Sequence, residues 1–359
     1  MLNSNLMKKH NFCAGPSILP KEVIIQAAES VLDINESGLS LLEISHRSKT
    51  FIDIMEEARS LVLDLTKLNG EDYSVLFLQG GASSQFSMVP YNILSTKAAY
   101  LDTGAWSNKA IKEAKLFGDV NVIASSKDSN YNYIPDYKIP DDYDYFHCTS
   151  NNTIYGTQIH KFKASKAPVI CDMSSDIFSR ELEFSKFDLI YAGAQKNLGP
   201  AGATLVIVKN NILGKVSREI PSMMDYNVHI NKCSIYNTPP VFPVYVSLLN
   251  MKWLKNNGGI KTIEEINTKK ANLLYSEIDI NPLFKGHAKE VDRSIMNVTF
   301  NLVNDDFKET FNSMISNAGI IGINGHRSIG GYRASMYNAL PIESVKVLVE
   351  VMSELENKI

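Results

Sequence analysis

The sequence has no long hydrophobic run and very little net charge. No apolar segment approaches the length of a membrane span, and the first ten residues lack the apolar core of a signal peptide. The net charge is −3, and the charged residues, 21% of the chain, form no polybasic stretch. We therefore expect neither a membrane nor a nucleic acid as a partner, and we interpret the chain as a globular protein of the cytoplasm.

Cysteine is also scarce. The four cysteines are scattered at Cys13, Cys148, Cys171 and Cys233, with no CxxC pair and no Cys/His spacing typical of a metal site. This pattern predicts free thiols in a reducing compartment and no bound metal.

The chain is long enough for two domains, and most of it alternates apolar runs with helical patterns. Such alternation is typical of βαβ units and predicts an α/β fold with a large, mostly parallel sheet. A break at Gly258-Gly259 precedes a long helical pattern, and we place the domain boundary near residue 260. The prediction is a large domain over 16–260 and a smaller α/β domain that combines 1–15 with 261–359.

The predicted elements follow from periodicity and from turn residues. In the large domain we expect helices over 23–34, 51–68, 80–94, 106–117 and 243–255, and strands over 74–78, 98–101, 121–124, 143–148, 169–171, 189–192 and 204–208. In the small domain we expect helices over 260–277, up to 317–319 and from 341, and strands over 295–302 and 331–336.

The most informative stretch runs from Tyr191 to Gly202 and contains one lysine, Lys196. This lysine comes just after a predicted buried strand, in a loop of small residues. Partial burial there would lower the pKa of its ammonium group and free a nucleophilic amine that can form a Schiff base with a carbonyl carbon.

Asp172 ends another predicted buried strand, 24 residues before Lys196. Ligands of open α/β sheets bind beyond the carboxyl ends of the strands. A lysine and a carboxylate at neighbouring strand ends suit pyridoxal 5′-phosphate (PLP), because the lysine can hold the aldehyde and the carboxylate can keep the pyridine nitrogen protonated. Taken singly, the lysine fits a solvated loop and the aspartate fits a helix N-cap; together they favour the cofactor.

An anion site is predicted at Gln79–Phe86, where a glycine pair and two serines join a strand to a helix. Backbone amides at a helix N-terminus suit a phosphate. The stretch is neither a Walker loop nor a GxGxxG motif, so it does not indicate a nucleotide. An ordinary tight turn explains it equally well when it is considered alone.

Trp106 and Thr153 each follow a predicted strand. Trp106 fits either a core aromatic residue or a flat face that stacks on a pyridine ring. Thr153 fits either a turn or a hydroxyl that contacts the phenolic oxygen of the cofactor.

Arginine is rare in this chain, yet three arginines lie in short stretches that also contain histidine, serine or glycine. They occur in His46-Arg47, in His326-Arg327 and at Arg333. Exposed surface positions are the simplest explanation for arginines. Their clustering favours a doubly anionic substrate, because the guanidinium fork matches carboxylate and phosphate oxygens.

These stretches together resemble the phosphoserine aminotransferases, class V members of the fold-type-I PLP enzymes, over nearly the whole chain. The resemblance is carried by Asn11–Pro16, Glu43–Arg47, Tyr191–Gly202, Tyr236–Pro240, Asn256–Gly259, Gly325–Arg327 and Gly330–Ser335. It implies a fold-type-I PLP-transferase with a large sheet domain and a smaller C-terminal domain.

The resemblance implies roles for the residues around the cofactor. Lys196 would bind PLP covalently, Asp172 would pair with its pyridine nitrogen, Trp106 would stack on its ring and Thr153 would contact its phenolic oxygen. The cofactor phosphate would be held by Ala82, Ser83 and Gln195, and by Asn237 and Thr238 reaching over from the second subunit of a homodimer.

The resemblance also implies a substrate site and a reaction. Arg333 would bind the α-carboxylate, while His46, Arg47, His326 and Arg327 would bind the phosphate of the substrate or the distal carboxylate of L-glutamate. The reaction would transfer the amino group of L-glutamate to 3-phosphohydroxypyruvate, and the same site would also accept 3-hydroxy-2-oxo-4-phosphonooxybutanoate, which belongs to pyridoxine synthesis.

Two stretches depart from the family pattern. The phosphate loop reads Gly80-Gly-Ala-Ser-Ser84, where many bacterial relatives carry further glycines and an arginine. Cys13-Ala14 replaces a pair of small hydroxyl residues. The first departure removes a positive charge and the second weakens any side-chain contact to glutamate.

Other functions fit the sequence less well. A serine–pyruvate or alanine–glyoxylate aminotransferase would need no distal anion site, and a cysteine desulfurase would need a cysteine on a mobile loop. A non-catalytic PLP-binding protein would have no need for Lys196, Asp172 and the three arginines together.

Overall fold

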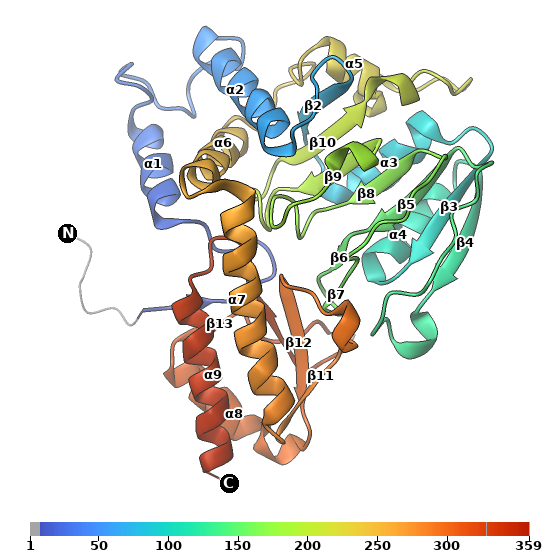
Figure 1. The fold of residues 1–359 in the computed structure, drawn as a ribbon. Helices are drawn as coiled ribbons and strands as arrows, with labels where there is room; N and C mark the ends of the chain where they lie inside the picture. The colour runs from blue at the N-terminus through green and yellow to red at the C-terminus, as the bar shows by residue number, and fades with distance from the viewer. Residues whose placement is uncertain (1–7, 328, 359) are drawn as a thin grey trace.

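The computed structural model describes residues 8–327 and 329–358 and shows two regions of packed α/β structure (Figure 1). The larger region is built on a seven-stranded sheet in the order β2-β10-β9-β8-β5-β3-β4. Its strands span Tyr73–Leu78 (β2), Lys97–Asp102 (β3), Asp119–Ser125 (β4), Tyr145–Thr149 (β5), Val169–Asp172 (β8), Leu189–Gly193 (β9) and Thr204–Lys209 (β10).

Strand direction in this sheet is mixed. The pairs β3–β4, β3–β5, β5–β8 and β8–β9 are parallel, whereas β10 runs antiparallel to both β9 and β2. Only the loop 194–203 separates β9 from β10, which is too short for a parallel crossover. The expected mostly parallel sheet is therefore confirmed, and the carboxyl ends of β8 and β9 lie side by side.

Helices cover both faces of the sheet, because alternate residues of each strand point to opposite faces. On one face, α2 (Lys49–Thr66) and α6 (Val241–Asn256) share a core with side chains such as Phe77 and Ile190. On the other face, α3 (Gly81–Ile93), α4 (Ala105–Ala114) and α5 (Tyr226–Asn231) pack against Leu76 and Tyr191. Helix α1 (Lys21–Leu32) lies outside α6.

The second region has a separate apolar core. It combines a three-stranded antiparallel sheet with the long helix α7 and with helices α8 and α9 (Figure 1). The sheet strands are β11 (Phe284–Gly286), β12 (Asn297–Leu302) and β14 (Tyr332–Ser335), and the helices span Gly259–Ile280, Lys308–Asn317 and Ile342–Asn357. We propose that this region, with the N-terminal residues, forms the predicted small domain.

The N-terminal segment belongs structurally to this second region. Strand β1 (His10–Asn11) pairs in parallel with β13 (Ile320–Ile321), and Phe12 enters the second core. The sequence analysis did not predict β1, β13, α5, β11 or the two-residue strands β6 (Asn151–Asn152) and β7 (Thr157–Gln158). Elements of two or three residues carry too few side chains to show a period, and the 6 residues of α5 complete less than two helical turns.

The turn after β14 is anchored from two sides. The buried Lys270 of α7 donates from Nζ to the carbonyl oxygens of Met336, Tyr337 and Leu340, at 2.8–3.1 Å. The backbone amide of Asn338 donates to Oδ1 of Asn197 at 2.9 Å. Since Asn197 follows Lys196, this turn fixes the second region directly against the loop that carries the lysine.

Candidate active site

Asp172 and Lys196 lie together at the carboxyl edge of the sheet. Asp172 is the last residue of β8, Lys196 lies three residues beyond the end of β9, and the two strands are parallel neighbours. Each affects the ionisation of the other: Asp172 favours the charged form of Lys196, and Lys196 favours the charged form of Asp172. The juxtaposition predicted from the two strand ends is present in the structure.

The amine of Lys196 is poorly solvated. Burial, with a smaller contribution from the nearby Arg333, lowers its pKa to about 8 against the opposing effect of Asp172. Its Nζ donates to Oγ1 of Thr153 at 2.8 Å and lies 5.7 Å from the centroid of the Trp106 ring. A substantial fraction of this lysine is therefore neutral and nucleophilic near pH 8.

Among the described residues, the hydrogen bonds to the Asp172 carboxylate reach one of its two oxygens. Its Oδ1 accepts hydrogen bonds from the backbone amide of Ser174 at 2.9 Å and from the Ser174 hydroxyl at 2.6 Å. Burial raises the pKa of Asp172, although Lys196 and the bonds from Ser174 favour the carboxylate. A cation beside Oδ2 would offset the cost of burying the carboxylate. A protonated pyridine nitrogen is such a cation.

The N-terminal segment passes over the lysine. The backbone amide of Ser17 donates to the carbonyl oxygen of Gln195 at 3.0 Å. The Ser17 hydroxyl donates to the carbonyl oxygen of Lys196. Gly15 has a φ of +146°, and a Cβ there would come within 3.3 Å of Cγ of Lys196 and 3.4 Å of the Gln195 oxygen. A side chain at position 15 would therefore press on the stem of the lysine.

The predicted phosphate loop forms the N-terminus of α3. Gly80 has a φ of +91°, and a Cβ there would lie 1.9 Å from Oγ of Ser84, so this turn requires glycine. Ala82 is half-buried and Ser83 is exposed. The unpaired amides of this first turn suit a phosphate, and the fit of Ala82, Ser83 and Gln195 to that group stays a proposal.

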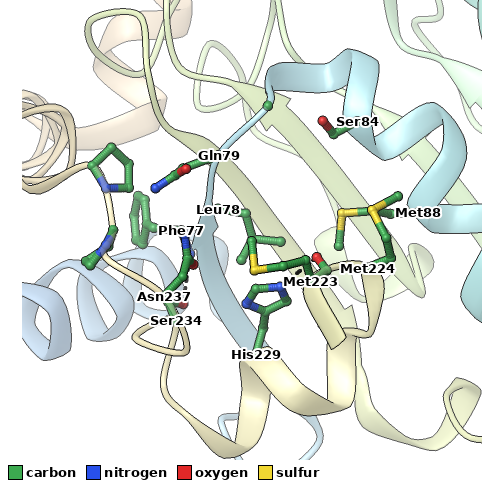
Figure 2. A pocket seen from close by; sticks show the side chains of 13 residues that line it. Phe77, Leu78, Gln79, Ser84, Met88, Met223, Met224, His229, Ser234 and Asn237 are labelled. Atoms are coloured by element: carbon green, nitrogen blue, oxygen red, sulfur yellow. Dashed lines mark hydrogen bonds between the residues drawn. The ribbon is translucent and has the colours of Figure 1, made fainter. Parts of the chain in front are cut away.

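Asn237 and Thr238 lie beside the phosphate loop of their own chain. Nε2 of Gln79 donates to the Thr238 carbonyl oxygen at 2.6 Å. A pocket of about 270 Å³ separates this segment from the start of α3, and Figure 2 shows Gln79 and Asn237 on one side of the strand and Ser84 on the other.

Arg333 and the segment after β13 bring positive charge to the site. Arg333, on β14, is half-buried; its buried Nε has no hydrogen-bond partner among the described residues, and burial lowers its pKa. Burial, followed by the positive charges of Arg333, Lys109 and Arg327, lowers the pKa of His326. Arg333, Lys109 and Arg327 thus bring positive charge to this part of the site, which suits an anion.

His46 and Arg47 are not brought to Lys196 within one chain. They lie between α1 and α2, where Ser48 caps α2 by accepting a hydrogen bond from the Phe51 amide. Arg47 is exposed, and its guanidinium forms no ion pair within residues 8–327 and 329–358.

The sequence analysis missed Tyr337. Its buried hydroxyl donates to the Ala14 carbonyl oxygen at 2.8 Å, lies 3.4 Å from Nδ2 of Asn297, and also interacts with the Thr153 hydroxyl. It joins the N-terminal segment to the hydroxyl that accepts from Lys196. No local sequence pattern indicates such a contact, since Tyr337 and Ala14 are far apart in the chain.

The residues present fit PLP. A partly neutral lysine amine can capture an aldehyde, the free Oδ2 of Asp172 can pair with a pyridinium nitrogen, and the glycine turn at α3 offers amides to a phosphate. Trp106, whose ring lies near the amine, supplies a flat face for stacking. A fold-type-I sheet with these groups at its carboxyl edge defines a PLP-dependent enzyme.

Comparisons with known proteins agree with this class. The family model of the class-V aminotransferases matches residues 10–348. A phosphoserine aminotransferase of Flavobacterium psychrophilum is 67% identical over 98% of this chain and 100% of its own. The chain therefore belongs to the class-V aminotransferases and, within them, to the phosphoserine aminotransferases.

Solved structures show the same fold. A phosphoserine aminotransferase studied for radiation damage of its Schiff base superposes with a TM-score of 0.95 at 45% identity, covering 99% of this chain and 100% of that one. A PLP-bound phosphoserine aminotransferase of Trichomonas vaginalis superposes with a TM-score of 0.91 at 35% identity, covering 96% and 100%.

Two further structural findings concern metals and membranes. Within the described ranges, no group of three or more His, Cys, Asp or Glu side chains is placed to hold a metal ion. None of the helices in those ranges has the length and apolar character needed to cross a bilayer.

The lowered pKa of Lys196 predicts how cofactor capture depends on pH. Because the neutral amine is the reactive form, the rate at which cofactor-free protein captures PLP should rise from pH 6.5 and level off above a midpoint of about 8. Stopped-flow absorbance on addition of PLP measures it. A midpoint near 10.5, the value of a solvated lysine, would show that burial does not activate this amine.

Proposed function

We propose that the protein transfers the amino group of L-glutamate to 3-phosphohydroxypyruvate, giving O-phospho-L-serine and 2-oxoglutarate in serine biosynthesis. The observation that carries this proposal is the meeting of the Lys196 amine with the guanidinium of Arg333, which together with Arg327 also acts on His326. A substrate with a carboxylate at one end and a phosphate at the other complements this arrangement.

Each residue then has a separate task. When bound, PLP supplies a ring that withdraws electrons from the carbanion formed at the substrate α-carbon. Nζ of Lys196 takes the proton from that carbon as a general base and later returns a proton as a general acid. Thr153, 2.8 Å from Nζ, orients the amine, and the carboxylate of Asp172 holds positive charge at the inner end of the site.

Arg333 orients the substrate by its α-carboxylate. Its half-buried guanidinium has an unpaired Nε, and its strand is held by the anchored turn that follows it. Removing one member of a desolvated charge pair typically costs several kcal/mol of binding free energy. Arg333 can therefore favour substrates that carry an α-carboxylate over compounds that lack it.

His326 and Arg327 determine the specificity for the distal anion. The same pair would bind the phosphate of 3-phosphohydroxypyruvate, the phosphate of 3-hydroxy-2-oxo-4-phosphonooxybutanoate and the distal carboxylate of L-glutamate. We therefore propose that the enzyme also acts in pyridoxine biosynthesis on the longer phosphorylated acid.

Arg327→Ala tests the distal anion site. We expect kcat/KM for 3-phosphohydroxypyruvate to fall by about 10²-fold, corresponding to roughly 3 kcal/mol for a lost charged contact. Lys285→Ala, which removes an exposed charge from β11 in the same region, should change it less than twofold. An unchanged kcat/KM in Arg327→Ala would refute the role, and parallel assays with the longer phosphorylated acid test the second pathway.

We also propose that the active unit is a homodimer. Large apolar side chains are exposed along one stretch of the chain, with Leu32 83% exposed on α1, Leu42 62% exposed after it, and Ile52 exposed on α2. His46 and Arg47 lie in the same stretch, away from Lys196 of their own chain. Pairing these surfaces would bury the apolar side chains and carry His46 and Arg47, as well as Asn237 and Thr238, toward the site of the other subunit.

Mixing two inactive variants tests this arrangement. A double variant His46→Ala/Arg47→Ala and the variant Lys196→Ala should each lose activity as separate homodimers. After subunits are exchanged, a hybrid dimer would hold one site with an intact lysine and an intact His46-Arg47 pair. We expect about one quarter of the wild-type activity from a random equimolar mixture, since half of the dimers would be hybrids with one working site. Activity that stays at the level of the separate variants would contradict shared sites.

A cytoplasmic location is part of the proposal. All four cysteines are free, and Sγ of Cys148 lies 3.7 Å from Sγ of Cys171 without a bond between them. Free thiols in close contact fit a reducing compartment.

A further inference from the structure

The large domain contributes a cation, Lys109, to the rim of the active site. Lys109 lies on α4, three residues after Trp106, and its Nζ lies 4.4 Å from the centroid of the Trp106 ring. The Lys196 amine lies 5.7 Å from the same centroid. The ammonium groups of Lys109 and Lys196 therefore both lie near the Trp106 ring. Lys109 is thus close to the site in which Lys196 reacts.

Lys109 has no countercharge within its own helix. Glu113 lies one turn later, where an i,i+4 ion pair would be expected for neighbouring opposite charges. Instead, Oε2 of Glu113 accepts a hydrogen bond from the Ser87 hydroxyl of α3 at 3.1 Å. Lys109 forms no ion pair anywhere within the described ranges, and its amine is directed toward Trp106.

The turn after β13, which belongs to the second region, approaches the same part of the site as Trp106. Ile329 and Trp106 both pack against a buried cluster of Tyr131, Ile154 and Tyr155. The turn that carries His326 and Arg327 therefore shares a packing cluster with the indole ring beside which Lys109 lies. Lys109 is also among the positive charges that lower the pKa of His326, which places the two groups within electrostatic range.

We propose that Lys109 is a further substrate-binding residue, which contacts the phosphate group of the substrate from the large domain opposite His326 and Arg327. This inference rests on the proposed function, because it takes that pair as the distal anion site. A dianionic phosphate benefits from a further cation more than a single carboxylate does. Lys109 would accordingly favour phosphorylated oxo acids over L-glutamate at this site.

The experiment compares four variants of the holoenzyme. Lys109→Ala removes the charge, Lys109→Arg preserves it, Lys112→Ala removes an exposed lysine three residues further along the same helix, and Arg327→Ala reports on the proposed site itself. Alanine is a good helix former and position 109 is exposed, so Lys109→Ala should fold normally. For each variant we would measure kcat and KM for 3-phosphohydroxypyruvate, KM for L-glutamate and the inhibition constant of inorganic phosphate.

In Lys109→Ala we expect KM for 3-phosphohydroxypyruvate and the inhibition constant of phosphate each to rise about tenfold, with kcat within twofold. The KM for L-glutamate should rise less than threefold, and Lys109→Arg and Lys112→Ala should stay within twofold of the wild type. If Lys109→Ala leaves both phosphate-dependent constants within twofold while Arg327→Ala raises them, the inference about Lys109 is wrong and the proposed function stands. If neither variant raises them, the proposed distal anion site fails as well.

Discussion

Replacing Lys196 with alanine should lower turnover by at least four orders of magnitude, on the order of the loss seen when a central catalytic group is removed. The variant loses both the nucleophile that captures PLP and the group that moves the proton at the substrate α-carbon. The surrounding contacts persist, because Thr153, Asp172 and the Gly80 turn are held by other residues. The cofactor should therefore still bind, without a covalent bond.

Two measurements distinguish this result from unfolding. After treatment with borohydride and denaturation, the wild type should keep the cofactor attached and Lys196→Ala should release it. Addition of a small primary amine should restore part of the lost turnover, since a free amine can stand in for Nζ. Substantial turnover by Lys196→Ala without an added amine would contradict the assignment. The exposed Lys112 of α4, replaced by alanine, serves as a control that should keep full activity.

Replacing Asp172 with asparagine should lower kcat by about 10³-fold, since an amide cannot hold the pyridine nitrogen of PLP in its protonated form. Asparagine keeps an oxygen that can accept from the Ser174 amide and hydroxyl, so the end of β8 should retain its geometry. A kcat within tenfold of the wild type would show that Asp172 does not support the ring.

The stability of this variant gives an independent check. Burial raises the pKa of Asp172, so holding the carboxylate ionised at neutral pH costs stability in the cofactor-free protein. This cost increases as the pH rises through the folded-state pKa, and asparagine removes it. The free energy of unfolding of the cofactor-free Asp172→Asn protein at pH 7 should therefore equal or exceed that of the wild type, as denaturant titration would show.

The centre of the site could be predicted because strand ends are local features. The apolar runs that end at Asp172 and before Lys196 are short, strongly patterned and bounded by small residues, and β8 and β9 are adjacent in the structure. The Gly80 turn could be predicted for a similar reason, since a glycine pair between a strand and a helix is visible without tertiary information.

The supporting residues could not be predicted because their contacts are non-local. Tyr337 bonds to Ala14 and Lys270 holds the turn after β14, yet neither residue belongs to a local motif. Lys109 reads as an ordinary exposed residue of an amphipathic helix until the position of Trp106 and His326 is known. The antiparallel direction of β10 follows from a short loop rather than from the strand sequence.

His46 and Arg47 show a different limit. The sequence groups them with His326 and Arg327 by chemistry, whereas one folded chain separates them from Lys196. In the proposed homodimer these two residues would act on the site of the other subunit, which no pattern within one chain can indicate, and the exposed apolar residues of the same stretch would form the contact.

The central claim, amino transfer between L-glutamate and a phosphorylated oxo acid, is tested most directly by following the absorbance of the protein-bound cofactor through both half-reactions. L-Glutamate should bleach the band of the holoenzyme, and 3-phosphohydroxypyruvate should restore it, whereas pyruvate and glyoxylate should not. If L-glutamate leaves the band unchanged while alanine or serine bleaches it, the enzyme has another specificity, and the roles given to Arg333, His326 and Arg327 are wrong.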